Sequence, residues 1–346
     1  MVPDGSGEDG DPHAGLRVWL LEHASTGPVE RIEQLVGGNS NATYQVVAQG
    51  GRFIVRRPPL HAMSASAHSM DREHRVLCAL AGTDVPVPAA LAICTDPTVF
   101  GAPFVVMSEV LGVPLSDHLP ETYGPDAVTR LGHQMVDALA SLHGVDWEAA
   151  GLTGFGRPSG FLERQVTRWR SQFQSYAVRD LPVFEAVAGW LEQNLPAAPQ
   201  RPGLLHGDFH LDNCLWSTEA PELMAVIDWE LSTIGDPLVD LGLCLALWGH
   251  RPVPVPALAR IQAVSRVPGA PSVEELAERY AQRAGRPVTH LPFYRVLALW
   301  KLAAILEGAY AQHVGGQLDS EYARSLRADV PTLLDEAAAH AGVAAL

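Results

Sequence analysis

Two short stretches near residue 210 contain polar residues whose types and spacing suit metal-assisted chemistry at a hydroxyl group. The first reads LLHGDFHLDN and contains Asp208 and Asn213, and the second reads VIDWE and contains Asp228. Each begins with an apolar run that predicts a short buried strand, and each places a carboxylate at the strand tip. An aspartate, an amide and a second aspartate form an oxygen-rich set that suits Mg²⁺ and a hydroxyl to be deprotonated.

The first part of the chain has the pattern of a small sheet that could carry such a site. A glycine-rich segment separates the first two strand-like stretches, and Gly50-Gly51 separates the next pair, as in a hairpin. We expect a five-stranded sheet plus one helix, preceded by an amphipathic helix. The predicted strands cover residues 29–36, 43–48, 52–57, 89–94 and 103–110, the helix covers 67–81, and the preceding helix covers 13–25.

From residue 114 onward the pattern becomes mostly helical, and the two carboxylate motifs lie on the only strand-like pieces expected there. Together with the sheet, this predicts an α+β fold. The predicted helices cover residues 126–142, 161–176, 182–195, 238–248, 272–284, 291–313 and 320–339.

Length and composition limit the class of protein. A chain of 346 residues is long enough for two lobes, and we expect a disordered tail over 1–12, a first lobe over 13–110 and a second over 111–346. No apolar run reaches the ~18 residues needed to cross a bilayer, so membrane insertion is not expected. The first residues lack the pattern of a secretion signal, and a cytoplasmic location is the resulting expectation.

The charged residues limit the class of partner. The formal net charge is −15, from 24 basic and 39 acidic residues, which argues against nucleic acid as a partner. Lys301 is the only lysine, so every other long cationic side chain is an arginine. The 4 cysteines form no Cys-x-x-Cys pair and are interpreted as buried thiols. The oligomeric state stays open.

A glycine-rich turn over residues 37–41 joins the first two predicted strands. Gly38 lets the backbone fold over a ligand, and the exposed amides of Asn39 and Asn41, together with the Ser40 hydroxyl, can donate to phosphate oxygens. An ordinary hairpin turn explains the same sequence. Its position before a basic strand favours the phosphate hypothesis.

The spacing His-Gly-Asp-(four residues)-Asn, followed by Ile-Asp-Trp-Glu, resembles the catalytic and metal motifs of the aminoglycoside phosphotransferase-like kinases, which are relatives of the protein kinases. Four further stretches, GGNSN, RRPP, SAHSMDRE and IDWELSTIGDPL, resemble the branch of that family associated with acyl-CoA dehydrogenases. The resemblance implies a protein-kinase-like bilobal fold, ATP and Mg²⁺ as cofactors, and a small-molecule hydroxyl acceptor. In that branch, the implied acceptor is a hydroxyacyl compound or a hydroxyacyl-CoA.

The same resemblance implies roles for the motif residues. Asp208 is the residue that orients, and can deprotonate, the attacking hydroxyl. Asn213 and Asp228 are the implied Mg²⁺ ligands. His206 is expected to be structural, with its ring hydrogen-bonded to backbone. The polar residues Asp236 and Asp240, which follow the second motif, are also interpreted as structural, with Asp236 capping the next helix.

Arg56 stands where related kinases carry the lysine that grips the α- and β-phosphates, and no lysine lies in this lobe. Arginine keeps the charge but has a planar head, so the two are not interchangeable. Strand alternation places Ile54 and Arg56 on one face, where Ile54 would touch the adenine, and Arg57 on the other. Glu73, on the helix that follows, is the implied ion-pair partner of Arg56.

Residues 107–110 are the implied hinge, whose backbone groups would meet the adenine edge. The four residues are Met107, Ser108, Glu109 and Val110, and an ordinary edge strand is the alternative.

Two hypotheses of other classes stay open. A zinc or dimetal hydrolase could use the mixed His and Asp side chains of the two motifs, which are His206, Asp208, His210, Asp212 and Asp228. A nucleotide-binding module without transferase activity would fit the missing lysine. Within the kinase hypothesis, an aminoglycoside or a sugar is the alternative acceptor. Four candidate pocket residues, Trp248, His250, Trp300 and Tyr310, are interpreted as core.

Overall fold

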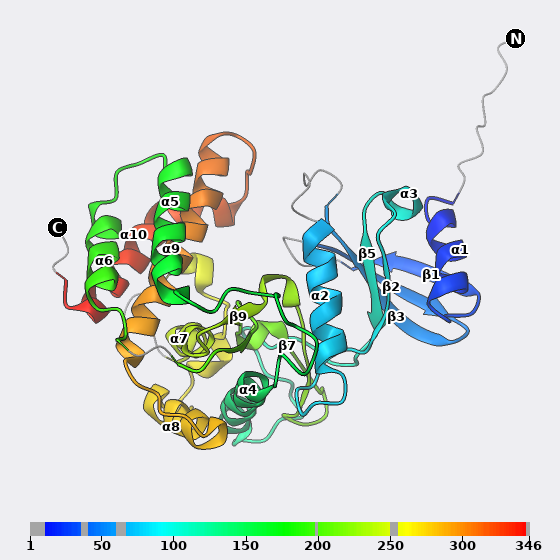
Figure 1. Cartoon of the computed structure of the whole chain (residues 1–346), viewed down its shortest axis with the longest axis horizontal. Coiled ribbons are helices and arrows are strands. Elements are labelled where there is room, and N and C mark those ends of the chain that lie inside the picture. Colours follow the sequence, from blue (N-terminus) through cyan, green and yellow to red (C-terminus); the bar gives the residue numbers. More distant parts are fainter. Residues whose placement is uncertain (1–10, 36–40, 60–66, 198–199, 250–254, 344–346) are drawn as a thin grey trace, which may run out of the picture. The chain divides into compact units, whose positions relative to one another are not determined.

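The computed structural model describes residues 11–35, 41–59, 67–197, 200–249 and 255–343 (Figure 1). The first ten residues of the predicted tail therefore lie outside the described part. Contacts divide the chain into two compact units. The first comprises Met1–Ala81, Val87–Val110 and Asp228–Glu230, and the second comprises Gly82–Pro86, Leu111–Ile227 and Leu231–Leu346.

The first unit contains a five-stranded antiparallel sheet, which confirms the predicted sheet. Its strands lie in the order β1-β2-β3-β5-β4, so only β5 and β4 depart from chain order. In the register of β3 and β5, Ile54 lies opposite Met107 and Arg56 lies opposite Val105. The strands are β1 (Val29–Gln34), β2 (Ala42–Ala48), β3 (Gly51–Arg57), β4 (Ala90–Cys94) and β5 (Phe104–Ser108).

Alternation along the strands gives this sheet two different faces. Val55 and Phe104 pack with Leu16 and Leu20 of helix α1 (Ala14–His23), which forms the core on one face. Helix α2 (Ala67–Leu80) contacts β4 and β5. The short helix α3 (Pro97–Phe100) was not predicted, although Asp96 and the proline after it are an N-cap signal that could have shown it.

The second unit is mostly helical. Helix α9 is its central element and contacts α5, α6, α7 and α10 (Figure 1). Within the described part of the chain, every helix is too short or too polar to cross a membrane. The helices are α4 (Ala127–Gly144), α5 (Phe161–Tyr176), α6 (Pro182–Gln193), α7 (Leu238–Leu247), α8 (Val273–Ala284), α9 (Leu291–Val314) and α10 (Glu321–Ala341).

The aromatic residues considered for a pocket are largely core, as predicted. Trp300 is fully buried, stacks on Phe184 at a centroid distance of 4.7 Å and donates its ring N–H to the Phe184 carbonyl. Trp248 is also buried. Tyr310 is half-buried beneath the Arg179 guanidinium, and the prediction for residue 250 lies outside the described residues.

Four short strands of the second unit flank the two carboxylate motifs in the sequence, and Asp228–Glu230 of the second motif belong to the first unit. Strand β6 (Gly203–Leu205) pairs with β9 (Thr233–Gly235), and β7 (Cys214–Trp216) pairs with β8 (Leu223–Val226). The prediction that the motifs lie on the only strand-like pieces was wrong, because β7 and β9 were missed. A three-residue strand is too short to show alternation, and its pairing depends on a partner that is distant in the sequence.

Candidate active site

The first motif begins with a turn that only glycine can make at residue 207. Gly207 has a φ of +88°, and a Cβ there would lie 2.4 Å from the Leu231 carbonyl oxygen. Asp240, a buried residue of α7, accepts the backbone N–H of His206 at 2.6 Å and that of Gly207 at 3.0 Å. A fixed carboxylate therefore holds the backbone immediately before Asp208. The structural role predicted for Asp240 is confirmed.

His206 links the first motif to the second. Its ring Nε2 lies 2.9 Å from the Ile227 carbonyl oxygen, and the Asp208 backbone N–H donates to its Nδ1 at 3.3 Å. The Ile227 N–H in turn donates to the Asn213 carbonyl at 2.9 Å, and Ile227 immediately precedes Asp228 in the chain. The structural role predicted for His206 is confirmed.

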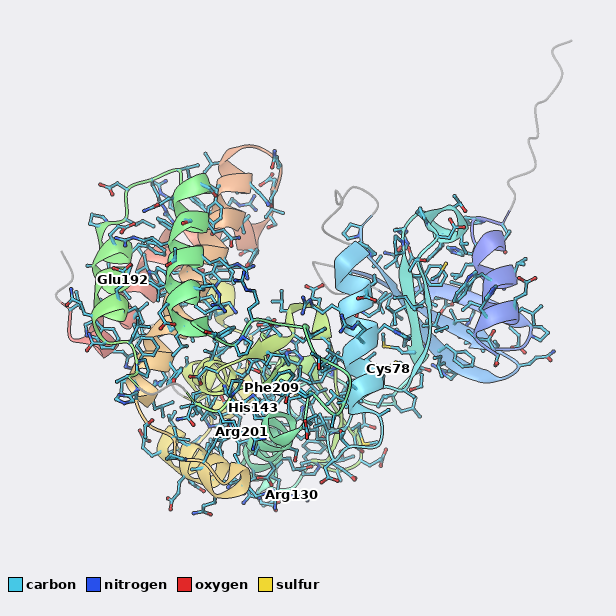
Figure 2. All side chains as sticks on the ribbon, viewed as in Figure 1. Cys78, Arg130, His143, Glu192, Arg201 and Phe209 are labelled. Carbon is cyan, nitrogen blue, oxygen red and sulfur yellow. The ribbon has the colours of Figure 1, made fainter. Side chains whose placement is uncertain are left out.

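Asp208 presents a partly exposed carboxylate on a fixed backbone. Its side chain is 41% exposed, whereas the neighbouring Phe209 (Figure 2) is buried. The Phe209 ring lies nearly perpendicular to that of His206. The Asn213 side-chain amide donates to the Asp208 carbonyl at 2.9 Å and to its Oδ2 at 3.2 Å. Because its nitrogen faces Asp208, Asn213 directs its carbonyl oxygen away, which fits a ligand for a hard cation.

Neighbouring charges keep the Asp208 carboxylate ionised. Burial alone would raise its pKa, but the hydrogen bond and charge of His210, with the charge of Lys301, lower the pKa to about 2. Burial likewise opposes the charged form of His210, yet Asp208 and Asp212 raise its pKa to about 9. At neutral pH the loop therefore holds a carboxylate beside an imidazolium. So weakly basic a carboxylate acts chiefly by orienting a hydroxyl.

A second cluster lies in the first unit, around Arg56. Its guanidinium is ion-paired with Glu73 of α2 and lies 3.1 Å from Asp228 Oδ1. The expected ion pair between Arg56 and Glu73 is therefore present. Burial raises the pKa of Glu73 to about 6, although Arg56 opposes this shift. For Arg56 itself, burial lowers the pKa, but Glu73 and Asp228 outweigh burial and raise it.

Arg57 lies on the opposite face of β3. It donates to the Tyr44 hydroxyl at 2.8 Å, and its guanidinium lies 4.7 Å from the centroid of the Phe100 ring. Both aromatic residues pack with the core that α1 covers. The predicted alternation is thus present, and it separates Arg57 from the Glu73 side of the strand.

The other residues predicted to contact the nucleotide are those of the glycine-rich turn, Ile54 and the hinge. Gly38, Asn39 and Ser40 lie outside the described residues. The Asn41 side chain is buried, and its side-chain amide donates to Glu230 Oε2 at 2.6 Å. Ile54 is half-buried.

At the predicted hinge, part of the backbone is already hydrogen-bonded. The Ser108 N–H donates to the Ala89 carbonyl, and the Glu109 N–H donates to the Arg52 carbonyl. The Glu109 carboxylate pairs with the Arg52 guanidinium. Met107 is buried in β5, and Val110 is the last residue of its segment in the first unit. An adenine edge would therefore have to use the other backbone groups of residues 107–110.

Three residues support the first motif in a way that was not predicted from the sequence, although His210 was considered there as a metal ligand. His210 contacts Asp208, Lys301 donates to the Gly207 carbonyl at 3.1 Å, and Gln262 accepts the Leu211 N–H at 2.8 Å. The unique lysine was a signal that could have found Lys301. No local pattern marks Gln262, because its partners in the loop, Leu211 and Asp212, lie 51 and 50 residues away in sequence.

The geometry opposes the metal-hydrolase hypothesis. Both ring nitrogens of His206 are engaged with backbone groups, which leaves neither nitrogen to bind a metal ion. Within the described ranges, no group of three or more His, Cys, Asp or Glu side chains is arranged to hold a metal ion.

Comparison with known families agrees with this geometry. A model of the phosphotransferase enzyme family matches residues 31–276, which is more than half of the chain. The chain belongs to this family. The recognition from the sequence motifs is therefore confirmed.

Two similar proteins extend this result. Acyl-CoA dehydrogenase family member 10 of Mus musculus is 36% identical over 307 residues, which are 88% of this chain but only 28% of the mouse protein. A crystal structure from Ralstonia eutropha JMP134, described as an aminoglycoside phosphotransferase, has 31% identity and a TM-score of 0.82 over 95% of this chain and 97% of that one.

A more distant structure supports the fold alone. The ternary complex of aminoglycoside phosphotransferase APH(4)-Ia with AMP-PNP and hygromycin B has a TM-score of 0.60 at 17% identity, over 93% of this chain and 98% of that one. The kinase-like phosphotransferase fold predicted from the sequence is confirmed.

Proposed function

We propose that the protein is a kinase that transfers the γ-phosphoryl group of MgATP to a hydroxyl of a small molecule. The observation that carries this proposal is the setting of Asp208. Its carboxylate is ionised and partly exposed, while Asp240, His206 and Asn213 hold the backbone on either side of it. A fixed, weakly basic carboxylate suits the alignment of a hydroxyl nucleophile better than it suits a structural cap.

The other motif residues would bind the nucleotide and its metal ion. Asn213 and Asp228 would supply oxygen ligands to Mg²⁺, which when bound neutralises charge on the phosphates. One oxygen of Asp228 is paired with Arg56, so the metal and the guanidinium would share this carboxylate. Arg56 would also direct positive charge toward the phosphates. The AMP-PNP complex of the APH(4)-Ia fold relative supports ATP as the donor.

The chemistry requires little covalent participation by the protein. Asp208 accepts a hydrogen bond from the acceptor hydroxyl and directs its oxygen toward the γ-phosphorus. As that oxygen forms its bond to phosphorus, the bond to the β–γ bridging oxygen breaks and ADP leaves. Because its pKa is about 2, Asp208 takes the proton late, when the hydroxyl has become strongly acidic through bonding to phosphorus.

For the acceptor, we propose a hydroxyacyl compound or hydroxyacyl-CoA. The similarity to acyl-CoA dehydrogenase family member 10 supports this choice, although the chain corresponds to only 28% of that protein. An aminoglycoside is the second candidate, which the name of the Ralstonia eutropha structure favours.

A turnover screen with MgATP and panels of hydroxyacids, hydroxyacyl-CoA compounds, sugars and aminoglycosides tests the function. We expect Asp208→Ala to lower phosphoryl transfer by a factor of about 10³ or more while MgATP binding is retained, since the carboxylate acts on the acceptor. Asp319→Ala, which removes an exposed acid of the same unit, should leave transfer unchanged. Loss of ATP affinity equal to the loss of rate would contradict the assigned role.

The same screen separates the other functions. A nucleotide-binding module would be stabilised by MgATP but would transfer phosphate to none of the acceptors. A metal hydrolase would contain tightly bound zinc, measurable by elemental analysis of the purified protein.

A further inference from the structure

The chain's only lysine lies beside the loop that carries Asp208. Lys301 belongs to α9, and its Nζ donates to the Gly207 carbonyl oxygen at 3.1 Å. The ammonium also lies 5.5 Å from the centroid of the Trp169 ring of α5, at the distance of a cation–π contact. The side chain is partly buried between two helices and the loop.

This hydrogen bond adds to the support of a short run of backbone, from the His206 N–H to the Asp208 carbonyl. Asp240 accepts the N–H groups of His206 and Gly207, and Asn213 donates to the carbonyl of Asp208. The carbonyl between them belongs to Gly207, and Lys301 is its donor. Glycine resists backbone rotation less than any other residue, so this peptide is the point at which the loop can turn. Rotation of the backbone at this position would change the direction of the Asp208 carboxylate.

The positive charge of Lys301 also suits its position beside the loop that carries Asp208. The loop and its supports contain the carboxylates of Asp208, Asp212 and Asp240, and an ammonium offsets part of that negative charge. Trp169 is buried and holds its ring in place through a hydrogen bond to Gln165. An ammonium, unlike a guanidinium, is a compact point charge that can donate to one carbonyl in a narrow space.

We infer that Lys301 is a positioning residue for phosphoryl transfer: by holding the Gly207 carbonyl from α9, it sets the direction of the Asp208 carboxylate. The inference rests on the proposed kinase function. The residue has no counterpart in the sequence motifs, because it lies 94 positions after its partner.

Lys301→Met tests the inference, because methionine keeps an unbranched apolar stem and removes the ammonium. We expect kcat to fall about 10- to 100-fold, as for a misplacement of roughly 1 Å, with the KM for ATP within about two-fold of wild type. Lys301→Arg, which restores a charged donor, should recover part of the lost kcat. Arg295→Met, which removes another cation of α9 near His340, should leave kcat unchanged.

Hydrogen exchange of residues 206–213 provides a readout that does not depend on the acceptor. These amides should exchange faster in Lys301→Met than in wild type or in Arg295→Met. The amides of α4 should exchange at the same rate in all three proteins. Unchanged exchange and unchanged kcat in Lys301→Met would overturn the inference. A wild-type protein that transfers no phosphate from MgATP would overturn the proposed function instead, and the exchange result would still decide whether Lys301 holds the loop.

The unique lysine permits a chemical test as well. Acetylation with an amine-directed reagent should inactivate the wild type in proportion to the fraction of Lys301 that is modified. Mass spectrometry measures that fraction. Lys301→Arg treated in the same way should keep its residual activity. Equal inactivation of both proteins would show that another amine is responsible and would count against the inference.

Discussion

Arg56 occupies a position that a lysine could not fill in the same way. Its guanidinium reaches Glu73 with one nitrogen and Asp228 with another, so a single side chain joins α2 to the second motif's aspartate. An ammonium is a point charge, whereas the planar fork presents donors in fixed directions. Two acidic partners, the buried Glu73 and the partly exposed Asp228, also explain why the pKa of Arg56 is raised although Arg56 is buried.

Arg56→Ala should weaken nucleotide use, because it removes the positive charge proposed to face the phosphates. We expect the KM for ATP to rise by about ten-fold or more, which corresponds to roughly 1.4 kcal/mol. Arg57→Ala is the matched control: it removes an arginine that contacts Tyr44 and Phe100 on the opposite face, and should lower the Tm without changing the KM. An unchanged KM in Arg56→Ala would refute the assignment.

At the scale of elements, the loop around Asp208 depends on helices that are distant in sequence. Asp240 comes from α7, Lys301 from α9, and Gln262 from the segment that precedes α8. Gln262 is fully buried with a φ of +51°, and its side chain also donates to the Cys244 carbonyl of α7. A strained, buried amide persists only where several hydrogen bonds compensate for its conformation.

His143 links the helices α4, α7 and α8, and it makes the stability of the folded protein depend on pH. It is buried on α4 (Figure 2). Its ring lies 2.7 Å from the Tyr280 hydroxyl of α8 and 3.4 Å from Asp240 of α7. Burial lowers its pKa, and Asp240 opposes this only in part. The unfolded chain therefore binds a proton near pH 6.5 that the folded protein does not, so stability falls as pH decreases through that value.

We expect His143→Gln to reduce the drop in Tm between pH 7.5 and pH 5.5, even if its Tm at pH 7.5 is lower than that of wild type. His118→Gln, at a side chain that is 87% exposed, should retain the wild-type drop. Thermal unfolding at four pH values measures the drop in Tm for both variants. An identical pH dependence in His143→Gln and wild type would show that His143 is not the group that titrates.

At the scale of the whole molecule, a bound nucleotide should stabilise the protein. A ligand at 100 times its Kd adds about 2.7 kcal/mol to the free energy of unfolding, which corresponds to a rise in Tm of roughly 4 °C for a protein of this size. EDTA should abolish the rise if Asn213 and Asp228 hold Mg²⁺. Asn213→Ala should reduce it, whereas Asn194→Ala, at the exposed end of α6, should not. An equal shift with and without EDTA would contradict the metal assignment.

Elements with a long periodic pattern were predictable from sequence, whereas short ones were not. Helix α5 was predicted to the residue, and the five strands of the sheet differ from prediction only at their ends. The strands β7 and β9 and the helix α3 have three or four residues each and carry too few positions for a period to appear. Tertiary pairing, rather than intrinsic preference, stabilises such pieces.

The sequence by itself determined the fold class, the family and the identity of the residues that could do chemistry, because Asp208, Asn213 and Asp228 lie close together in the chain at a characteristic spacing. Only the tertiary structure decided how the loop is held. The supports, Asp240, Gln262 and Lys301, lie between 33 and 94 residues from their partners. Contacts of that separation arise from helix packing, which no local pattern of residues encodes.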